Sequence, residues 1–118
     1  MPTFQGSCHC GDVTFQFSGE PITQGLRCNC SICARKGALM SSEVYGPAQL
    51  TFQAAEGALG CYQFGSGVAK HYFCTRCGIY PFHETVRKPG HYRVNLGCVD
   101  GVDSLTLPTQ VFDGKSLP

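Results

Sequence analysis

The sequence contains no tryptophan, no long apolar run and little charge. Charged residues make up 14% of the 118 residues, and nine Lys and Arg nearly balance eight Asp and Glu. Proteins that bind nucleic acids or anionic membrane surfaces use clustered basic residues, so this balance argues against both kinds of partner. No segment approaches the roughly 20 apolar residues that a membrane-spanning helix requires. We therefore expect no nucleic acid and no membrane among the partners.

The first residues also lack the features of an export signal. Met1 to Cys8 contain neither a basic segment nor an apolar run. Outside oxidising compartments disulfides are rare, and the nine cysteines are an odd number. The sequence therefore predicts a cytoplasmic protein whose clustered thiols bind metal.

Amphipathic helical periodicity is missing as well. One short helical turn is expected, over Ser31 to Lys36, and Gly37 ends it. Strict alternation places Val13, Phe15 and Phe17 on one face of a strand. Further strands are predicted at Leu39 to Tyr45, Leu50 to Ala54, Cys61 to Phe64, Ala69 to Phe73, and His91 to Leu96. The sequence thus predicts one all-β domain over residues 1–118, built of short antiparallel strands.

Seven of the nine cysteines fall into three clusters. They are Cys8-x-Cys10, Cys28-x-Cys30-x-x-Cys33 and Cys74-x-x-Cys77. Zinc lies about 2.3 Å from each thiolate in a tetrahedron, so its sulfur ligands lie within about 4 Å of one another. A tight turn bearing C-x-x-C meets this condition, and Gly78 favours such a turn because glycine accepts positive φ.

The C-x-C pair needs a local kink to bind one ion. On a regular strand Cys8 and Cys10 would lie two strand rises apart, which is too wide, and Gly11 can supply the kink. This half site needs two more thiolates, which Cys74 and Cys77 provide. We predict that these four cysteines form a closed structural zinc site.

The remaining cluster has three ligands of its own. Zinc sites that bind water or substrate keep three protein ligands and an open fourth position, so Cys28, Cys30 and Cys33 predict a second, reactive zinc. The alternative is a second structural site, completed by Cys98 or by a histidine. Cys61 alternates within a predicted strand and is expected to be a small buried residue.

The three clusters resemble the signatures of a known family. Gly6-Ser7-Cys8-His9-Cys10-Gly11, Cys28-Asn29-Cys30-Ser31-Ile32-Cys33 and Phe73-Cys74-Thr75-Arg76-Cys77-Gly78 are similar in order and spacing to those of the glutathione-dependent formaldehyde-activating enzymes, whose domain also occurs in centromere protein V. The segments from Cys77 to His83 and from Val94 to Asp100 resemble the centromere-protein-V-like branch. The resemblance covers essentially the whole chain.

This resemblance implies an all-β "β-tent" (Mss-four-like) fold with two zinc ions per chain. It places the structural zinc on the four-cysteine set and the second zinc on the three-cysteine set. It also implies carbon-sulfur lyase chemistry, in which glutathione and formaldehyde combine to S-hydroxymethylglutathione. The alternative is a non-enzymatic, zinc-stabilised module that binds a protein partner.

The family chemistry assigns further roles to residues near the second zinc. Arg27, Arg35 and Lys36 flank the cluster and would compensate the charge of glutathione. His83 or Tyr80 would donate a proton to the new alkoxide. Cys98 would be a neighbour of the second zinc, as a fourth ligand or as a thiol behind it.

Overall fold

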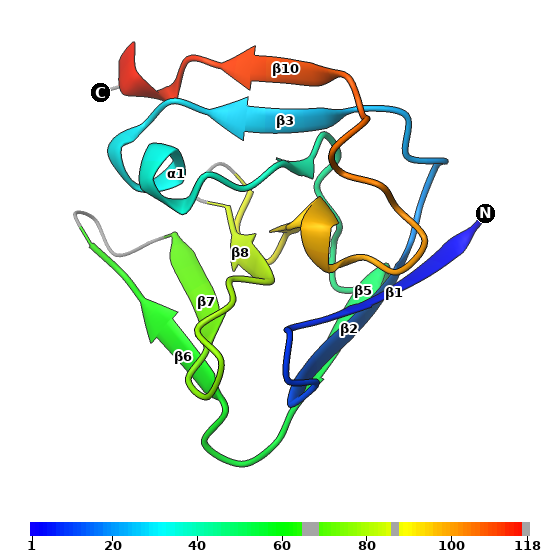
Figure 1. The fold of residues 1–118 in the computed structure, drawn as a ribbon, viewed down its shortest axis with the longest axis vertical. Coiled ribbons are helices and arrows are strands. Elements are labelled where there is room, and N and C mark those ends of the chain that lie inside the picture. Colours follow the sequence, from blue (N-terminus) through cyan, green and yellow to red (C-terminus); the bar gives the residue numbers. More distant parts are fainter. Residues whose placement is uncertain (65–68, 86–87, 117–118) are drawn as a thin grey trace.

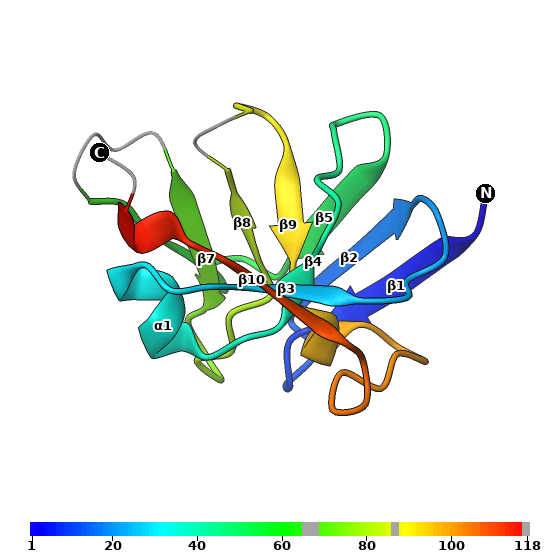
Figure 2. The same cartoon turned by 90° about the horizontal axis from the view of Figure 1, so that it is seen from above.

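Three small sheets form the protein and lie along three sides of a triangle (Figure 1). The computed structural model describes residues 1–64, 69–85 and 88–116. The first sheet has the strand order β1-β2-β5, the second β10-β3-β4, and the third β6-β7-β8-β9. Seen from above, the first and third sheets fan out beneath the paired strands β3 and β10 (Figure 2).

The strands and the helices are all short. The first sheet contains β1 (Thr3–Ser7), β2 (Val13–Ser18) and β5 (Leu50–Ala54). The second contains β3 (Gly25–Cys28), β4 (Met40–Ser41) and β10 (Thr109–Phe112). The third contains β6 (Leu59–Tyr62), β7 (Lys70–Cys74), β8 (Phe82–Glu84) and β9 (Tyr92–Val94). The helices are α1 (Ser31–Lys36) and the 3-10 turns η1 (Leu96–Cys98) and η2 (Gly114–Ser116).

The predicted all-β class is confirmed, with one exception in strand direction. Strand β10 pairs with β3 in parallel, and every other strand pair among the described residues is antiparallel. A parallel neighbour needs a long connection, which the chain between Cys28 and Thr109 supplies. The sequence pattern of two short, half-exposed strands carried no signal for this pairing.

The core lies between the first and third sheets. Val13, Phe15 and Phe17 of β2 are buried while Thr14 and Gln16 are exposed, as the alternation predicted. The ring centroid of Phe82 in β8 lies 5.7 Å from that of Phe15 and 5.0 Å from that of Phe52, so the two sheets meet at these rings. Each fully buried aromatic or aliphatic side chain of this kind contributes roughly 1.5–3 kcal/mol.

Two local predictions have opposite outcomes. Helix α1 has the predicted bounds, and Gly37 ends it in the left-handed conformation, with φ of 66°. Cys61, by contrast, is exposed. The prediction of a buried Cys61 is wrong because β6 lies at the edge of its sheet. Among the described residues, no helix has the length and apolar character needed to cross a membrane.

Candidate metal centres

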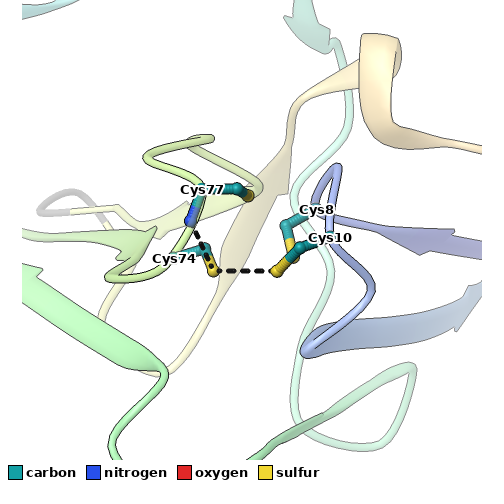
Figure 3. Close-up of side chains that lie close together, drawn as sticks. All are labelled: Cys8, Cys10, Cys74 and Cys77. Atoms are coloured by element: carbon teal, nitrogen blue, oxygen red, sulfur yellow. Dashed lines mark hydrogen bonds between the residues drawn. The ribbon is translucent and has the colours of Figure 1, made fainter.

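The first centre joins two turns from opposite sheets. Cys8 and Cys10 follow β1, Cys74 ends β7 and Cys77 follows it, and the four side chains point toward one another (Figure 3). The sulfur atoms all lie within 4.8 Å of one another. Cys10 Sγ lies 3.6 Å from both Cys8 Sγ and Cys74 Sγ, close to the spacing of about 3.8 Å in a tetrahedral zinc-thiolate site.

The turn at Cys74 is shaped by the backbone. The N–H of Gly78 donates to the carbonyl of Cys74, and the N–H of Cys77 donates to Cys74 Sγ at 3.5 Å. Gly78 has a φ of 79°, which favours glycine at this position as predicted. The turn therefore holds both sulfurs on one side.

The turn at Cys8 supplies the kink that the C-x-C spacing requires. Strand β1 ends at Ser7, so neither cysteine lies on regular strand, and Gly11 has a φ of 86°. The N–H of Val13 donates to Cys8 Sγ at 3.3 Å, and the N–H of Cys8 donates to the carbonyl of Val13. These bonds bring Cys8 and Cys10 to one ion.

The electrostatics of the four sulfurs fit a divalent cation. Backbone N–H groups of Cys10 and Ile79 lower the pKa of Cys77 to about 6 and so favour its thiolate. A backbone hydrogen bond near Asp12 acts in the same direction on Cys10, but desolvation and the neighbouring sulfurs raise its pKa to about 12. Thiolates packed this closely repel one another, and a bound dication removes that repulsion.

The second centre lies at the start of α1. The sulfurs of Cys28, Cys30 and Cys33 also lie within 4.8 Å of one another, and the N–H of Cys30 donates to Cys28 Sγ at 3.5 Å. Desolvation opposes ionisation of Cys30, but the backbone N–H groups of Cys33 and Ile32 lower its pKa. Burial and then the Cys30 sulfur raise the pKa of Cys33 to about 12. These three thiols fit a cation for the same reason as the first four.

The C-terminal segment covers one side of this second centre, which the sequence did not predict. Asn29 Nδ2 donates to Asp113 Oδ1 at 3.0 Å, and the N–H of Lys115 donates to Asn29 Oδ1 at 2.8 Å. A Cβ placed on Gly114 would lie 2.5 Å from Cys28 Sγ. The chain at Gly114 thus contacts the sulfur directly, and only the parallel pairing of β10 with β3 brings it there.

Cys98 belongs to neither sulfur group among the described residues. Its thiol contacts the carbonyl of Tyr80 at 3.9 Å. Burial, followed by the thiols of Cys8 and Cys77, raises its pKa to about 11. The structure thus places Cys98 in the electrostatic environment of the four-cysteine centre, and its predicted role at the second zinc stays a prediction.

The three basic residues near the second centre differ in orientation. Arg27 and Arg35 are exposed. Arg27 donates to the carbonyl of Gly37, and Arg35 donates to the carbonyl of Ser31. Lys36 is half-buried, and its Nζ lies 2.6 Å from His71 Nδ1 and 3.5 Å from the centroid of the Tyr80 ring. Lys36 is therefore the basic residue that points into the protein.

His83 joins this inward-pointing group. Its Nδ1 is hydrogen-bonded to the hydroxyl of Tyr80, and its ring lies 5.5 Å from that of His71. Burial, then the nearby charges of Lys36, His71 and Arg93, lowers the pKa of His83 to about 3. At neutral pH the ring is uncharged and shares one hydrogen with the Tyr80 hydroxyl. The predicted role of His83 as proton donor stays a prediction.

A groove elsewhere on the molecule lacks reactive side chains. It encloses about 430 Å³ over the first sheet. Its lining comprises Gln5, Gly6, Ser7, Gly11, Thr14, Phe15, Gln16, Thr51, Phe52, Gln53 and Asp100. No cysteine or histidine is among these residues, so chemistry is expected at the cysteine centres and not here.

Known proteins share both the sequence pattern and the fold. The family model of the glutathione-dependent formaldehyde-activating enzyme matches residues 3–114. The crystal structure of a Rhodobacter sphaeroides protein is 34% identical in sequence and superimposes with a TM-score of 0.78. That match covers 90% of this chain and 99% of the other. The two cysteine centres, their spacing and these matches together show that the chain belongs to the glutathione-dependent formaldehyde-activating enzyme family.

Proposed function

We propose that this protein adds the thiol of glutathione to formaldehyde at the centre formed by Cys28, Cys30 and Cys33. The reaction is the reverse of a carbon-sulfur lyase step and yields S-hydroxymethylglutathione. The observation that carries the proposal is the difference between the centres, since four sulfurs converge at one and three at the other. The supporting comparison is the family match.

Each centre would hold one zinc ion. At the second centre such an ion would supply Lewis acidity, which lowers the pKa of an incoming thiol toward neutrality. Cys28, Cys30 and Cys33 would hold that ion, and a zinc ion with three protein ligands can accept a thiol as a fourth. Cys8, Cys10, Cys74 and Cys77 would hold the structural ion with a complete set of four ligands.

Basic side chains compensate the charge that collects at the second centre. Three thiolates and one dication sum to a charge of −1, and glutathione adds further negative charge. Arg27 and Arg35 lie exposed beside the cluster, where they contact the carboxylates of the tripeptide. Tyr80 and His83 form the hydrogen-bonded pair that lines the inner side. His83 holds the Tyr80 hydroxyl in a hydrogen bond.

Cobalt substitution tests the open position. Cobalt-loaded protein should change its visible ligand-field spectrum when glutathione adds a sulfur to the second ion. Cys98→Ala is the matched control, and because Cys98 lies outside the three-sulfur group, both proteins should respond. A response in Cys98→Ala alone would mean that Cys98 fills the position. Spectra unmoved in both proteins would contradict the proposal and favour a zinc-stabilised protein-interaction module.

A further inference from the structure

A group of polar side chains lies beside the second centre, where Lys36 and Tyr80 interact electrostatically with Cys30 and Cys33. Lys36 comes from α1, His71 from β7 and His83 from β8, and Tyr80 precedes β8. These residues are distant in the chain, so the fold and not a local motif assembles them. Lys36 follows Cys33 by one helical turn, which places both side chains on one face of α1.

Two contacts fix the position of the Lys36 ammonium. Its Nζ lies 2.6 Å from His71 Nδ1 and 3.5 Å from the centroid of the Tyr80 ring. The His71 ring is itself held on its outer side by Phe64, which stacks on it at a centroid distance of 5.8 Å. A lysine side chain normally has large rotamer freedom, so this arrangement orders a charge that would otherwise move through solvent.

Lys36 is the charged member of this group, because both histidines and Tyr80 are neutral at pH 7. Burial, then the charge of Lys36, lowers the pKa of His71 to about 4, so its ring is neutral and its Nδ1 accepts from Lys36. The Tyr80 hydroxyl is bonded to His83 Nδ1. An ammonium has three N–H donors, and the contacts with His71 and the Tyr80 ring use two. Within the part of the chain that the structure describes, the third N–H meets no acceptor.

We propose that Lys36 is a catalytic residue that donates a hydrogen bond to the carbonyl oxygen of the aldehyde, a role that rests on the proposed function. His71 and Tyr80 are the positioning residues that aim its Nζ. This role differs from charge compensation of glutathione, because the partner is the oxygen that becomes negative during the reaction and not a carboxylate of the tripeptide.

The step is balanced without an oxidant or reductant. The thiolate sulfur forms a bond to the carbonyl carbon, and the π pair of the C=O bond moves onto oxygen. Lys36 stabilises that oxygen while the charge develops. The oxygen then takes one proton from water, which replaces the proton that the thiol released to water. Donors fixed in advance in a partly desolvated site stabilise such an oxyanion more than mobile ones do.

Reductive trapping tests the contact without requiring turnover. The zinc-loaded protein is treated with dilute formaldehyde and cyanoborohydride, and methylation is measured by peptide mass spectrometry at each lysine. If the aldehyde binds at Lys36 Nζ, Lys36 should be methylated about tenfold faster than the exposed Lys88 and Lys115. Burial lowers the pKa of Lys36 to about 8, which by itself raises the reactivity of its amine, so each methylation rate is divided by the acetylation rate of the same lysine with acetic anhydride. A corrected rate for Lys36 no higher than theirs would overturn the proposal.

Substitutions separate this role from a role in holding zinc and from a contact with the carboxylates of glutathione. Lys36→Met should lower kcat by about 100-fold at unchanged zinc content, and Lys36→Arg, which keeps a donor, should stay within about tenfold of the wild type. The loss in Lys36→Met should be equal with glutathione and with 2-mercaptoethanol, which has no carboxylate. A loss confined to glutathione would show a carboxylate contact and overturn the proposal. If the wild-type protein forms no thiol adduct, the proposed function fails, and the trapping experiment still decides whether the aldehyde contacts Lys36.

Discussion

The two cysteine centres use the same ligand atom but differ in how far apart their ligands lie in the chain. Cys10 and Cys74 of the first centre are 64 residues apart and come from different sheets. The ligands of the second centre all lie between Cys28 and Cys33, at the start of one helix. An ion at the first centre therefore joins two parts of the fold, whereas an ion at the second organises a single loop. Stability should depend on the first centre and chemistry on the second.

The largest expected effect is the loss of fold stability when the first centre loses a ligand. Cys77→Ala removes one of four ligands, and structural zinc contributes about 10 kcal/mol or more of apparent binding free energy to folding. We expect loss of the cooperative melting transition, measured by circular dichroism and calorimetry.

Cys30→Ala is the matched control for this prediction. It should lower the zinc content by one ion per chain and leave a folded protein with a cooperative transition. Equal unfolding of the two variants would show that the centres do not divide stability and chemistry as described. A native melting temperature in Cys77→Ala would sink the structural assignment of the first centre.

A smaller effect is expected on the pH dependence of the free energy of unfolding, through the titration of His83. His83 has a pKa of about 3 in the folded protein against 6.5 as its ordinary value. Between these values the unfolded chain binds more protons, so the free energy of unfolding falls as the pH falls. From pH 7 to pH 5 this loss amounts to about 2 kcal/mol.

His83→Asn tests this pH dependence, because the amide keeps an acceptor for the Tyr80 hydroxyl but does not titrate. Chemical denaturation at pH 7 and pH 5 should show a loss about 2 kcal/mol smaller in the variant than in the wild type. Zinc release contributes in both proteins and is followed by metal analysis at each pH. An equal loss in both would place the acid sensitivity in His71 and the cysteine centres and not in His83.

The smallest effect on stability is expected at Gly114. A valine side chain there would begin 2.5 Å from Cys28 Sγ and would displace that sulfur from the other two. Because η2 is partly exposed and lies at the edge of the fold, the melting temperature should change by only a few degrees, with a stability loss of about 1 kcal/mol.

The zinc content of Gly114→Val should nevertheless fall by one ion per chain, measured by metal analysis after gel filtration. Lys115→Ala is the neighbouring control, since Lys115 contacts Asn29 through its backbone N–H and keeps that bond. Two full equivalents of zinc in Gly114→Val would show that the C-terminal segment does not control the geometry of the second centre.

The sequence predicted the parts of these centres that depend on neighbouring residues. The spacings C-x-C-G and C-x-x-C-G determine local turns, and the positive φ of Gly11 and Gly78 agrees with that reasoning. The pairing of Cys8 and Cys10 with Cys74 and Cys77 could be predicted because zinc needs four ligands.

The environment of the second centre could not be predicted in the same way. The inward rotamer of Lys36 depends on His71 and Tyr80, which reach it only in the folded state. Strand β10 lies at a sheet edge with mostly exposed residues, so no apolar alternation marks it. Cys98 follows a strand, but nothing in its neighbours shows that it lies toward Cys8 and Cys77.

The parallel pairing of β10 with β3 also sets a time order during protein synthesis. Asn29 and Asp113, which join the cysteine loop to the C-terminal segment, are 84 residues apart. At 5–20 residues per second, a ribosome needs roughly 4–17 s to add those residues. During this interval Cys28, Cys30 and Cys33 have left the ribosome or are leaving it, and their covering segment does not yet exist. The thiols of the nascent chain are therefore open to metal, to oxidants and to free aldehyde before the mature site has formed.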